Sequence, residues 1–278
     1  MNSSTWCATA NQASCSSEAL LVSPSMQAGI SRAISSSVDE RPGMGSDLEG
    51  RVVTVVGGSR GIGFAVAQAA ALAGARVAII ARDAARLRAA SRALGGAYAF
   101  RADVTAGAQV ARAFRDIRRD CGRLDALVNS AGVFTFKFFE RTTLRDWRLN
   151  IEANLTAVFL ATRAALPLLV KSQGQLVNIL SISSRNAFAK CSAYTAAKFG
   201  ALGLTRVLAE ELRPQGIRVT AILPGATNTR LVRAFGFPVD REGLVQPEDV
   251  AQAVLGALLA PRRATVEEIV VTPSRGSL

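Results

Sequence analysis

From Arg51 onward, short runs rich in Val, Ile and Leu alternate with longer stretches rich in Ala and Leu. The short runs suit buried strands and the longer stretches suit helices, an alternation typical of a parallel sheet covered on both faces. The sequence therefore predicts an α/β fold: one doubly wound domain with a mainly parallel seven-stranded sheet, whose ligand binds beyond the carboxyl ends of the strands. The expected strands span residues 52–56, 77–81, 97–102, 126–129, 176–180, 218–223 and 268–271, and the expected helices span 62–73, 84–94, 106–119, 144–170, 192–212 and 247–259.

The composition excludes several kinds of chemistry. Of the 278 residues, 49% are hydrophobic, so the chain can bury a sizeable core. It contains no histidine, which rules out Ser-His triads, Cys-His dyads and nearly all catalytic zinc sites. Its four cysteines are widely spaced, so we expect no disulfide framework and no metal site, and a cytoplasmic location fits. Proton transfer must then use Tyr, Lys, Asp, Glu or Cys.

The net charge of +12 raises the question of nucleic-acid or membrane binding. Most of the basic residues are arginines scattered singly, without a long basic block or interleaved aromatic residues, so a solvated surface is favoured over a nucleic-acid site. A membrane span needs about 18 uncharged apolar residues, and Arg76 and Arg163 interrupt the best candidates. We therefore expect a small-molecule ligand, with neither nucleic acid nor membrane as partner.

Residues 1–45 differ in composition from the rest of the chain. They are rich in Ser, show no apolar period and include Pro42-Gly43. This pattern predicts a disordered leader before a catalytic domain at 46–278. Two interpretations remain open: Met44 is the true start, or the leader is a weak targeting segment for organellar import.

A glycine-rich turn follows the first expected strand and opens the first expected helix. Free backbone N–H groups and the helix dipole at such a position favour a pyrophosphate. Glycine permits the tight turn, the close approach of backbone to ligand and the close packing of helix on sheet. The sequence therefore predicts a dinucleotide cofactor held by Gly57, Ser59, Arg60, Gly61, Ile62 and Gly63.

The end of the second strand indicates which dinucleotide is bound. An acid there would hold the adenosine ribose hydroxyls, whereas a cation would hold a 2′-phosphate. The strand ends in Ala81-Arg82, and Arg82 with Arg60 can flank a dianionic phosphate. We expect Asp83 to cap the following helix instead. NADP(H) is thus favoured over NAD(H).

A tyrosine and a lysine four residues apart supply the proton chemistry that the missing histidines cannot. Tyr194 and Lys198 lie on one face of an expected helix, and a nearby cation favours a phenolate. Ser181 stands thirteen residues earlier, just past a strand rich in Val, Ile and Leu. A phenol beside a cation suits general acid–base chemistry.

With these motifs, the stretch from Leu48 to Pro273 resembles the short-chain dehydrogenase/reductase family, whose fold is Rossmann-type. Two departures are Val56, where the family has Thr, and Ser130, where it has Asn; both lose hydrogen bonds that tie neighbouring loops. The resemblance implies that the catalytic residues are Asn154, Ser181, Tyr194 and Lys198, and that further cofactor contacts come from Asp103, Val104, Asn129, Ala131, Gly132, Tyr194, Lys198, Pro224, Gly225, Thr227 and Thr229.

The resemblance also implies a mechanism: an NADP(H)-dependent oxidoreductase (EC 1.1.1.-) interconverts a carbonyl and a secondary alcohol. Tyr194 is the general acid/base and Ser181 holds the substrate oxygen. Lys198 lowers the pKa of Tyr194 and binds the nicotinamide ribose, while Asn154 anchors a water that connects Lys198 to solvent. A homo-oligomer, a tetramer or a dimer, is expected through the helices at 144–170 and 192–212.

Two alternatives to a general carbonyl reductase stay open. A 3-oxoacyl-acyl-carrier reductase is one, although the C-terminal segment ends near Pro273 and lacks an Asp-Gly-Gly motif frequent in those enzymes. A non-catalytic NADP(H)-binding redox sensor is the other, although such a protein does not need the four catalytic residues. A mostly apolar substrate is expected, bound by Ser181, Tyr194, Phe134 and Phe188, with Phe136, Leu231, Phe235 and Phe237 as further wall residues.

Overall fold

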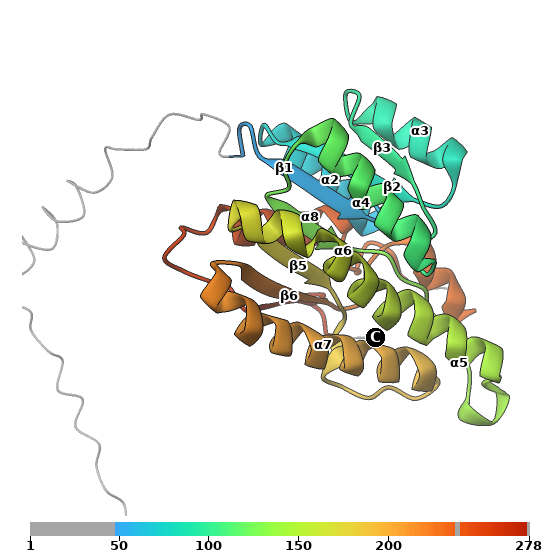
Figure 1. Ribbon diagram of the computed structural model, residues 1–278. Helices are drawn as coiled ribbons and strands as arrows, with labels where there is room; N and C mark the ends of the chain where they lie inside the picture. The colour runs from blue at the N-terminus through green and yellow to red at the C-terminus, as the bar shows by residue number, and fades with distance from the viewer. Residues whose placement is uncertain (1–47, 237–239, 277–278) are drawn as a thin grey trace, which may run out of the picture. The chain divides into compact units, whose positions relative to one another are not determined.

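The computed structural model describes residues 48–236 and 240–276 (Figure 1). The leader predicted at 1–45 lies outside these residues. Seven strands of the described chain pair in parallel, in the order β3-β2-β1-β4-β5-β6-β7, which confirms the predicted fold class. The strands are β1 (Val52–Val56), β2 (Arg76–Ala81), β3 (Tyr98–Arg101), β4 (Ala126–Asn129), β5 (Gln175–Ile179), β6 (Arg218–Pro224) and β7 (Glu268–Val271).

Helices cover both faces of the sheet (Figure 1). One face carries α2 (Gly61–Leu72), α3 (Ala84–Ala93) and α8 (Pro247–Leu259). The other carries α4 (Gly107–Cys121), α6 (Ala157–Ser172) and α7 (Ser192–Leu212), with α5 (Leu144–Ile151) leading into α6. Short helical turns are η1 (Phe139–Arg141), η2 (Glu152–Thr156), η3 (Ile182–Ser184), η4 (Arg213–Gln215) and η5 (Arg230–Phe235).

Strand β1 shows why this sequence gives a sheet with two covered faces. Its five residues are all buried, and successive side chains of a strand point to opposite faces. Val53 and Val55 pack in the core beneath α2 and α8, whereas Val52 and Val56 pack in the core beneath α4 and α6. An unbroken apolar run is therefore required here rather than an apolar–polar alternation.

The helix expected at 144–170 is a continuous helical segment, Leu144–Ser172, that contains a π-helical turn, η2. Among the described residues this one segment is long and apolar enough to cross a membrane, and half of its most apolar stretch is buried inside the domain. Core helices of soluble proteins share that property. The segment packs through Ala161, Ala165 and Leu169 in the core beneath β1 and β4.

The strand order reverses between β1 and β4, which are neighbours in the sheet although β2 and β3 separate them in sequence. In an open parallel sheet a crevice forms at this point, outside the carboxyl ends of the strands. The glycine turn follows β1 at this edge, and Ser130-Ala131-Gly132 follows β4 beside it. The topology thus brings two of the predicted motifs together.

Candidate functional site

The glycine turn is packed so closely that side chains would not fit. Gly57 has φ +82°, and a Cβ there would lie 2.7 Å from the backbone nitrogen of Ala131. A Cβ on Gly63 would lie 2.4 Å from the carbonyl oxygen of Gly57. Thr229, after β6, lies beside Gly61, because a Cβ on Gly61 would contact its methyl group at 3.5 Å. The turn that follows β1 is therefore packed against the loops that follow β4 and β6.

The N-terminus of α2 is suited to an anion. Arg60 is its N-cap residue, with φ −170°, and no side chain caps the helix by a hydrogen bond. The first turn contains no acidic residue. The unsatisfied N–H groups and the positive end of the helix dipole thus remain for a negatively charged ligand.

Four arginines at or near this turn interact electrostatically. Partial desolvation lowers the pKa of Arg60, and the positive charges of Arg86, Arg230 and Arg82 lower it further. A cluster of cations that repel one another favours a bound anion. We predicted Arg60 and Arg82 here but missed Arg86 and Arg230. The signals available were the position of Arg230 directly after Thr229 and that of Arg86 in the first turn of α3.

Two acids lie beside this cluster with different roles. Asp83 is the N-cap of α3 and its carboxylate accepts the N–H of Arg86 at 3.0 Å, which confirms its predicted capping role. Asp103 accepts bonds from the N–H and hydroxyl of Thr105, and these lower its pKa. Its carboxylate also lies 3.9 Å from the Arg82 guanidinium. Val104 packs at the edge of the adjoining core.

The structure brings Ser181, Tyr194 and Lys198 together. Ser181 caps η3, its hydroxyl accepting the N–H of Ser183 at 3.1 Å, and it shares a hydrogen bond with the Tyr194 side chain. Lys198 is 4% exposed, and its Nζ donates to the carbonyl of Ile179 at 3.0 Å. That Nζ lies 5.8 Å from the centroid of the Tyr194 ring.

Burial controls the protonation of both groups. It raises the pKa of Tyr194 to about 12, against a smaller lowering by Ser181, and it lowers the pKa of Lys198 to about 8. Without cofactor, desolvation thus outweighs the other influences on both groups, because it penalises each charged form. The lowering of the Tyr194 pKa by Lys198 stays a prediction.

Asn154 lies in η2 and is fully buried. Its Oδ1 accepts the N–H of Val133 at 3.2 Å, and its Nδ2 donates to the carbonyls of Val133 and Asn150 at 3.0 and 3.1 Å. A Cβ on Gly132 would lie 2.7 Å from the same Oδ1. The Asn154 side chain thus fixes the loop after β4. Its role in anchoring a water stays a prediction.

Most of the other predicted cofactor residues line the same edge. Pro224, Gly225 and Thr227 follow or end β6, and the Thr227 hydroxyl donates to the carbonyl of Gly225 at 3.0 Å. Asn129 instead points into the core. Its Nδ2 donates to Asn178 and Thr162, and its Oδ1 is buried without a partner among the described residues. A direct contact of the Asn129 side chain with a cofactor remains untested.

Aromatic side chains stand over Tyr194. The ring of Phe134 meets the Tyr194 ring edge-on at 4.8 Å between centroids. Phe235 lies 5.5 Å from Phe134 and 5.1 Å from Phe136. Phe188 is partly buried and has no ring contact within the described part of the chain, so only its place before α7 relates it to the site. Leu231 is 39% exposed in η5, and Phe237 lies outside the described residues.

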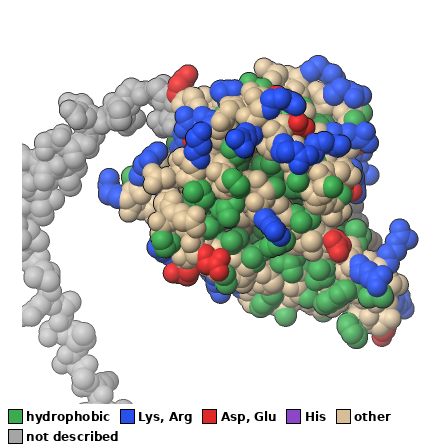
Figure 2. Space-filling view, in the orientation of Figure 1, with side chains coloured by type: hydrophobic (Ala, Val, Ile, Leu, Met, Phe, Trp, Pro, Cys, Tyr) green, Lys and Arg blue, Asp and Glu red, His purple; other side chains and the backbone are tan. Residues whose placement is uncertain are grey.

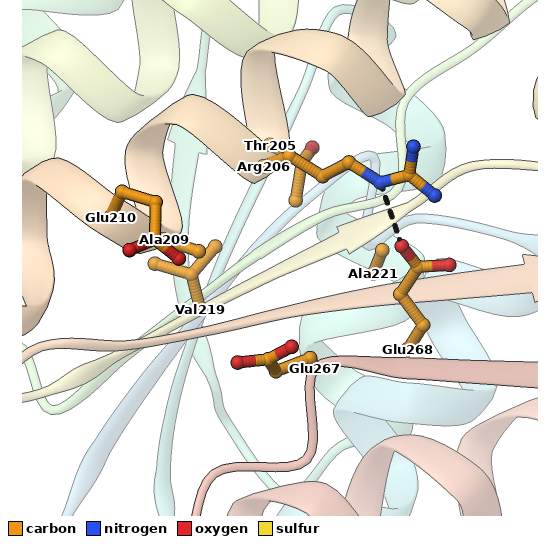
Figure 3. Close-up of a pocket in the computed structure, with 8 residues that line it drawn as sticks. All are labelled: Thr205, Arg206, Ala209, Glu210, Val219, Ala221, Glu267 and Glu268. Atoms are coloured by element: carbon orange, nitrogen blue, oxygen red, sulfur yellow. Dashed lines mark hydrogen bonds and ion pairs between the residues drawn. The ribbon is translucent and has the colours of Figure 1, made fainter.

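A hollow of about 260 Å³ lies away from these residues, between α7 and the edge strand β7 (Figure 3). Figure 3 shows the guanidinium of Arg206 directed at the carboxylate of Glu268, 2.9 Å away. Arg185, which follows η3, pairs with the same carboxylate. Through these ion pairs Glu268 links β7 to α7 and to the segment after Ser181. None of the predicted site residues lines the hollow.

Comparisons with known proteins agree with this geometry. The family model described as short chain dehydrogenase matches residues 51–236. The chain is 36% identical over 220 residues to a 3-oxoacyl-[acyl-carrier-protein] reductase of Bos taurus, covering 76% of this chain and 92% of that protein. Two solved structures resemble it. One is a metagenomic short-chain oxidoreductase in complex with NADP, with a TM-score of 0.71, 33% identity, and coverage of 82% of this chain and 99% of that one.

The other is an alcohol dehydrogenase from the archaeon Thermococcus sibiricus complexed with 5-hydroxy-NADP. Its TM-score is 0.75 at 28% identity, and the match covers 82% of this chain and 98% of that one. The family match includes the glycine turn, Ser181, Tyr194 and Lys198. From its fold, its site and these matches, the chain belongs to the short-chain dehydrogenase family.

Proposed function

We propose that this protein is an NADP(H)-dependent oxidoreductase that interconverts a carbonyl and a secondary alcohol on a mostly apolar substrate. One observation carries the proposal: Lys198 is buried beside the half-buried Tyr194 without a carboxylate to pair with it among the described residues. An unpaired buried cation costs stability and is rarely retained without a function. A proton relay at Tyr194 supplies that function.

In the reduction direction, Tyr194 acts as the acid. At neutral pH its phenol is protonated, since its pKa of about 12 lies far above that pH. The Ser181 hydroxyl orients the substrate carbonyl oxygen beside it. The phenol O–H bond breaks as the new alcohol O–H bond forms, and Lys198, whose pKa is lowered to about 8, returns a proton toward the phenolate. The cofactor, when bound, supplies the hydride that forms the new C–H bond.

The residues at the glycine turn fit a phosphorylated dinucleotide. The turn leaves no room for a Cβ at Gly57 or Gly63, and the α2 N-terminus is free of side-chain caps and acids. Arg60 and Arg82 would hold the 2′-phosphate of NADP(H), joined by Arg86 and Arg230. The NADP complex of one structural relative and the 5-hydroxy-NADP complex of another support this choice.

The substrate side is aromatic, since Phe134, Phe136 and Phe235 form one cluster against Tyr194. Such a surface favours an apolar carbonyl compound. The name of the bovine relative supports a second candidate, reduction of a 3-oxoacyl group on an acyl carrier. A 3-oxoacyl reductase should reduce carrier-bound thioesters faster than simple ketones, whereas a general carbonyl reductase should not need the thioester or its carrier.

We further propose that the active form is a homo-oligomer. Figure 2 shows hydrophobic side chains gathered on the face formed by α6 and α7. Phe159, Phe199 and Val207 on these helices are 44%, 45% and 52% exposed. Large apolar groups that share one helix pair usually meet a partner, and a second copy of the chain fits because a twofold interface pairs like surfaces.

A substrate panel tests the proposed activity. Ketones, aldehydes and 3-oxoacyl thioesters, free and on a carrier protein, are offered with NADPH or NADH while the loss of reduced-nicotinamide absorbance is followed. We expect turnover of apolar ketones or aldehydes with NADPH, abolished in Tyr194→Phe. Turnover only of carrier-bound thioesters would favour the second candidate. NADPH binding without turnover of any compound would contradict both.

A further inference from the structure

A second concave site lies at the opposite end of the sheet, where the strands begin. It has a volume of about 480 Å³. It is lined by Arg51 just before β1, by β6, by the end of α6, by the segments before β4 and β5, and by the end of α8 with the residues that follow it. Figure 2 shows Lys and Arg side chains on the side of the domain where β1 begins in Figure 1. The length of the strands, at about 3.3 Å per residue, separates this pocket from the site at Tyr194.

The lining of this pocket is strongly cationic. Four arginines face it, Arg51, Arg123, Arg218 and Arg262, against the single carboxylate of Asp125. Asp125 is already engaged, because it forms a two-point ion pair with Arg123 and accepts the N–H of Val52 at 2.8 Å. The pocket therefore has three positive charges in excess of its negative charge.

Neutral groups hold two of these guanidiniums in place. Arg51 donates to the side-chain oxygen of Gln175 at 2.8 Å and to the carbonyl of Leu258 at 3.3 Å. Arg218 donates from one nitrogen to three backbone carbonyls, the shortest bond being 2.6 Å to Ala260. Carbonyl acceptors orient a guanidinium but leave its charge uncancelled, and each guanidinium has five donors. The cations are thus fixed before any ligand arrives, which lowers the entropy cost of binding.

The arginines also act on one another across the pocket. Burial lowers the pKa of Arg51, and so do the charges of Arg262 and Arg123, while Asp125 raises it. Burial, Arg51 and Arg262 lower the pKa of Arg218 in the same way. An anion bound between these cations would offset the repulsion between them.

We propose that this pocket binds a phosphorylated small molecule through a diphosphate or polyphosphate group. Several fixed guanidinium forks match phosphate oxygens in geometry and charge, and the volume is in the range of small-molecule sites. The concave shape and small extent of the arginine cluster favour such a ligand over a nucleic-acid duplex, which requires an extended basic surface. The site is distinct from the glycine turn, which lies at the carboxyl ends of the strands.

Inorganic pyrophosphate is the probe, titrated calorimetrically into the full chain at low salt, with sodium chloride of matched ionic strength as the baseline. Arg262→Gln removes an exposed cation from the pocket, and Arg263→Gln removes an exposed cation one residue outside it. We expect pyrophosphate to bind about tenfold or more weakly to Arg262→Gln and with unchanged affinity to Arg263→Gln. Arg60→Gln, at the glycine turn, should keep this binding.

Three results would overturn the proposal: no binding beyond the chloride baseline, equal weakening by Arg262→Gln and Arg263→Gln, or a loss confined to Arg60→Gln. Equal weakening would indicate general surface attraction, and a loss in Arg60→Gln alone would assign the binding to the glycine turn. ADP in the same titration identifies the source of the phosphate. Tighter binding of ADP that depends on Arg262 indicates a nucleotide, and equal binding indicates a free polyphosphate.

Discussion

The contact between Gly63 and Gly57 gives a sharp prediction about the glycine turn. In Gly63→Ala the new methyl group would lie 2.4 Å from the Gly57 carbonyl oxygen, well inside van der Waals separation. The carbonyl belongs to the backbone and the methyl group is bonded directly to it, so neither can rotate away, and relief requires α2 or the turn to move by more than about 0.5 Å. Overpacking of this kind costs about 1–3 kcal/mol, while alanine returns up to about 1 kcal/mol in helix propensity.

We therefore expect Gly63→Ala to lower the free energy of unfolding by about 1–2 kcal/mol, equivalent to a fall in Tm of about 2–8 °C for a domain of this size. NADPH affinity should fall by about tenfold or more, because the displaced turn no longer presents its N–H groups to the pyrophosphate. Differential scanning calorimetry measures the first effect and isothermal titration the second.

Gly256→Ala is the matched control. Gly256 is an exposed residue within α8, and a Cβ there would have no neighbour within 4 Å among the described residues. Alanine should stabilise the domain by up to about 1 kcal/mol and leave NADPH affinity unchanged. If Gly63→Ala behaved like Gly256→Ala in both assays, the close packing of the turn could not be the reason for glycine at position 63.

Three further predictions concern charge, protonation and assembly. Arg82→Asp should erase or reverse the preference for NADPH over NADH in steady-state kinetics, and an unchanged preference would refute the phosphate role of the arginine cluster. The depressed pKa of Lys198, about 8 when folded, means that its charged form destabilises the folded protein at neutral pH. Lys198→Met should therefore be more stable than wild type by about 3 kcal/mol at pH 7 in denaturant unfolding. This advantage should shrink as pH rises from 8 to 10.5, and an advantage independent of pH would refute the burial argument. Phe199→Asp should yield smaller assemblies in light scattering, and an unchanged mass would place the interface elsewhere.

The elements that sequence patterns predict well are those set by local signals. Helix α7 and helix α8 have the predicted bounds, and α8 begins at Pro247, whose ring suits a first helical position. Gly122 ends α4 in the left-handed conformation that glycine favours. Strands β1, β4 and β7 also match, because their apolar runs are bounded by polar or glycine-containing segments.

Features that depend on distant residues were not predictable in this way. The π-helical turn η2 contains no proline or glycine, and it coincides with the place where Asn154 reaches across to Val133. Arg86 and Arg230 join the arginine cluster only through the fold. The raised pKa of Tyr194 results from burial, whereas the sequence shows only that Lys198 is four residues away.

The ionisation of Tyr194 can be observed directly before any substrate is known. The chain has two tyrosines, so the ultraviolet difference between wild type and Tyr194→Phe isolates one phenol. Without cofactor, Tyr194 should ionise near its raised pKa of about 12. Ionisation below the ordinary value of about 10 would show that the charge of Lys198 outweighs burial after all.

The account depends most directly on the activity of Tyr194→Phe. On a substrate that the wild type reduces well with NADPH, the variant keeps the ring that packs against Phe134 but lacks the proton donor. General acid catalysis contributes about 10²–10⁴-fold, so kcat should fall by at least that factor while the Kd for NADPH stays within about twofold of wild type. If the variant retained more than about a tenth of wild-type kcat, which is well above what loss of the acid allows, Tyr194 would not be the proton donor.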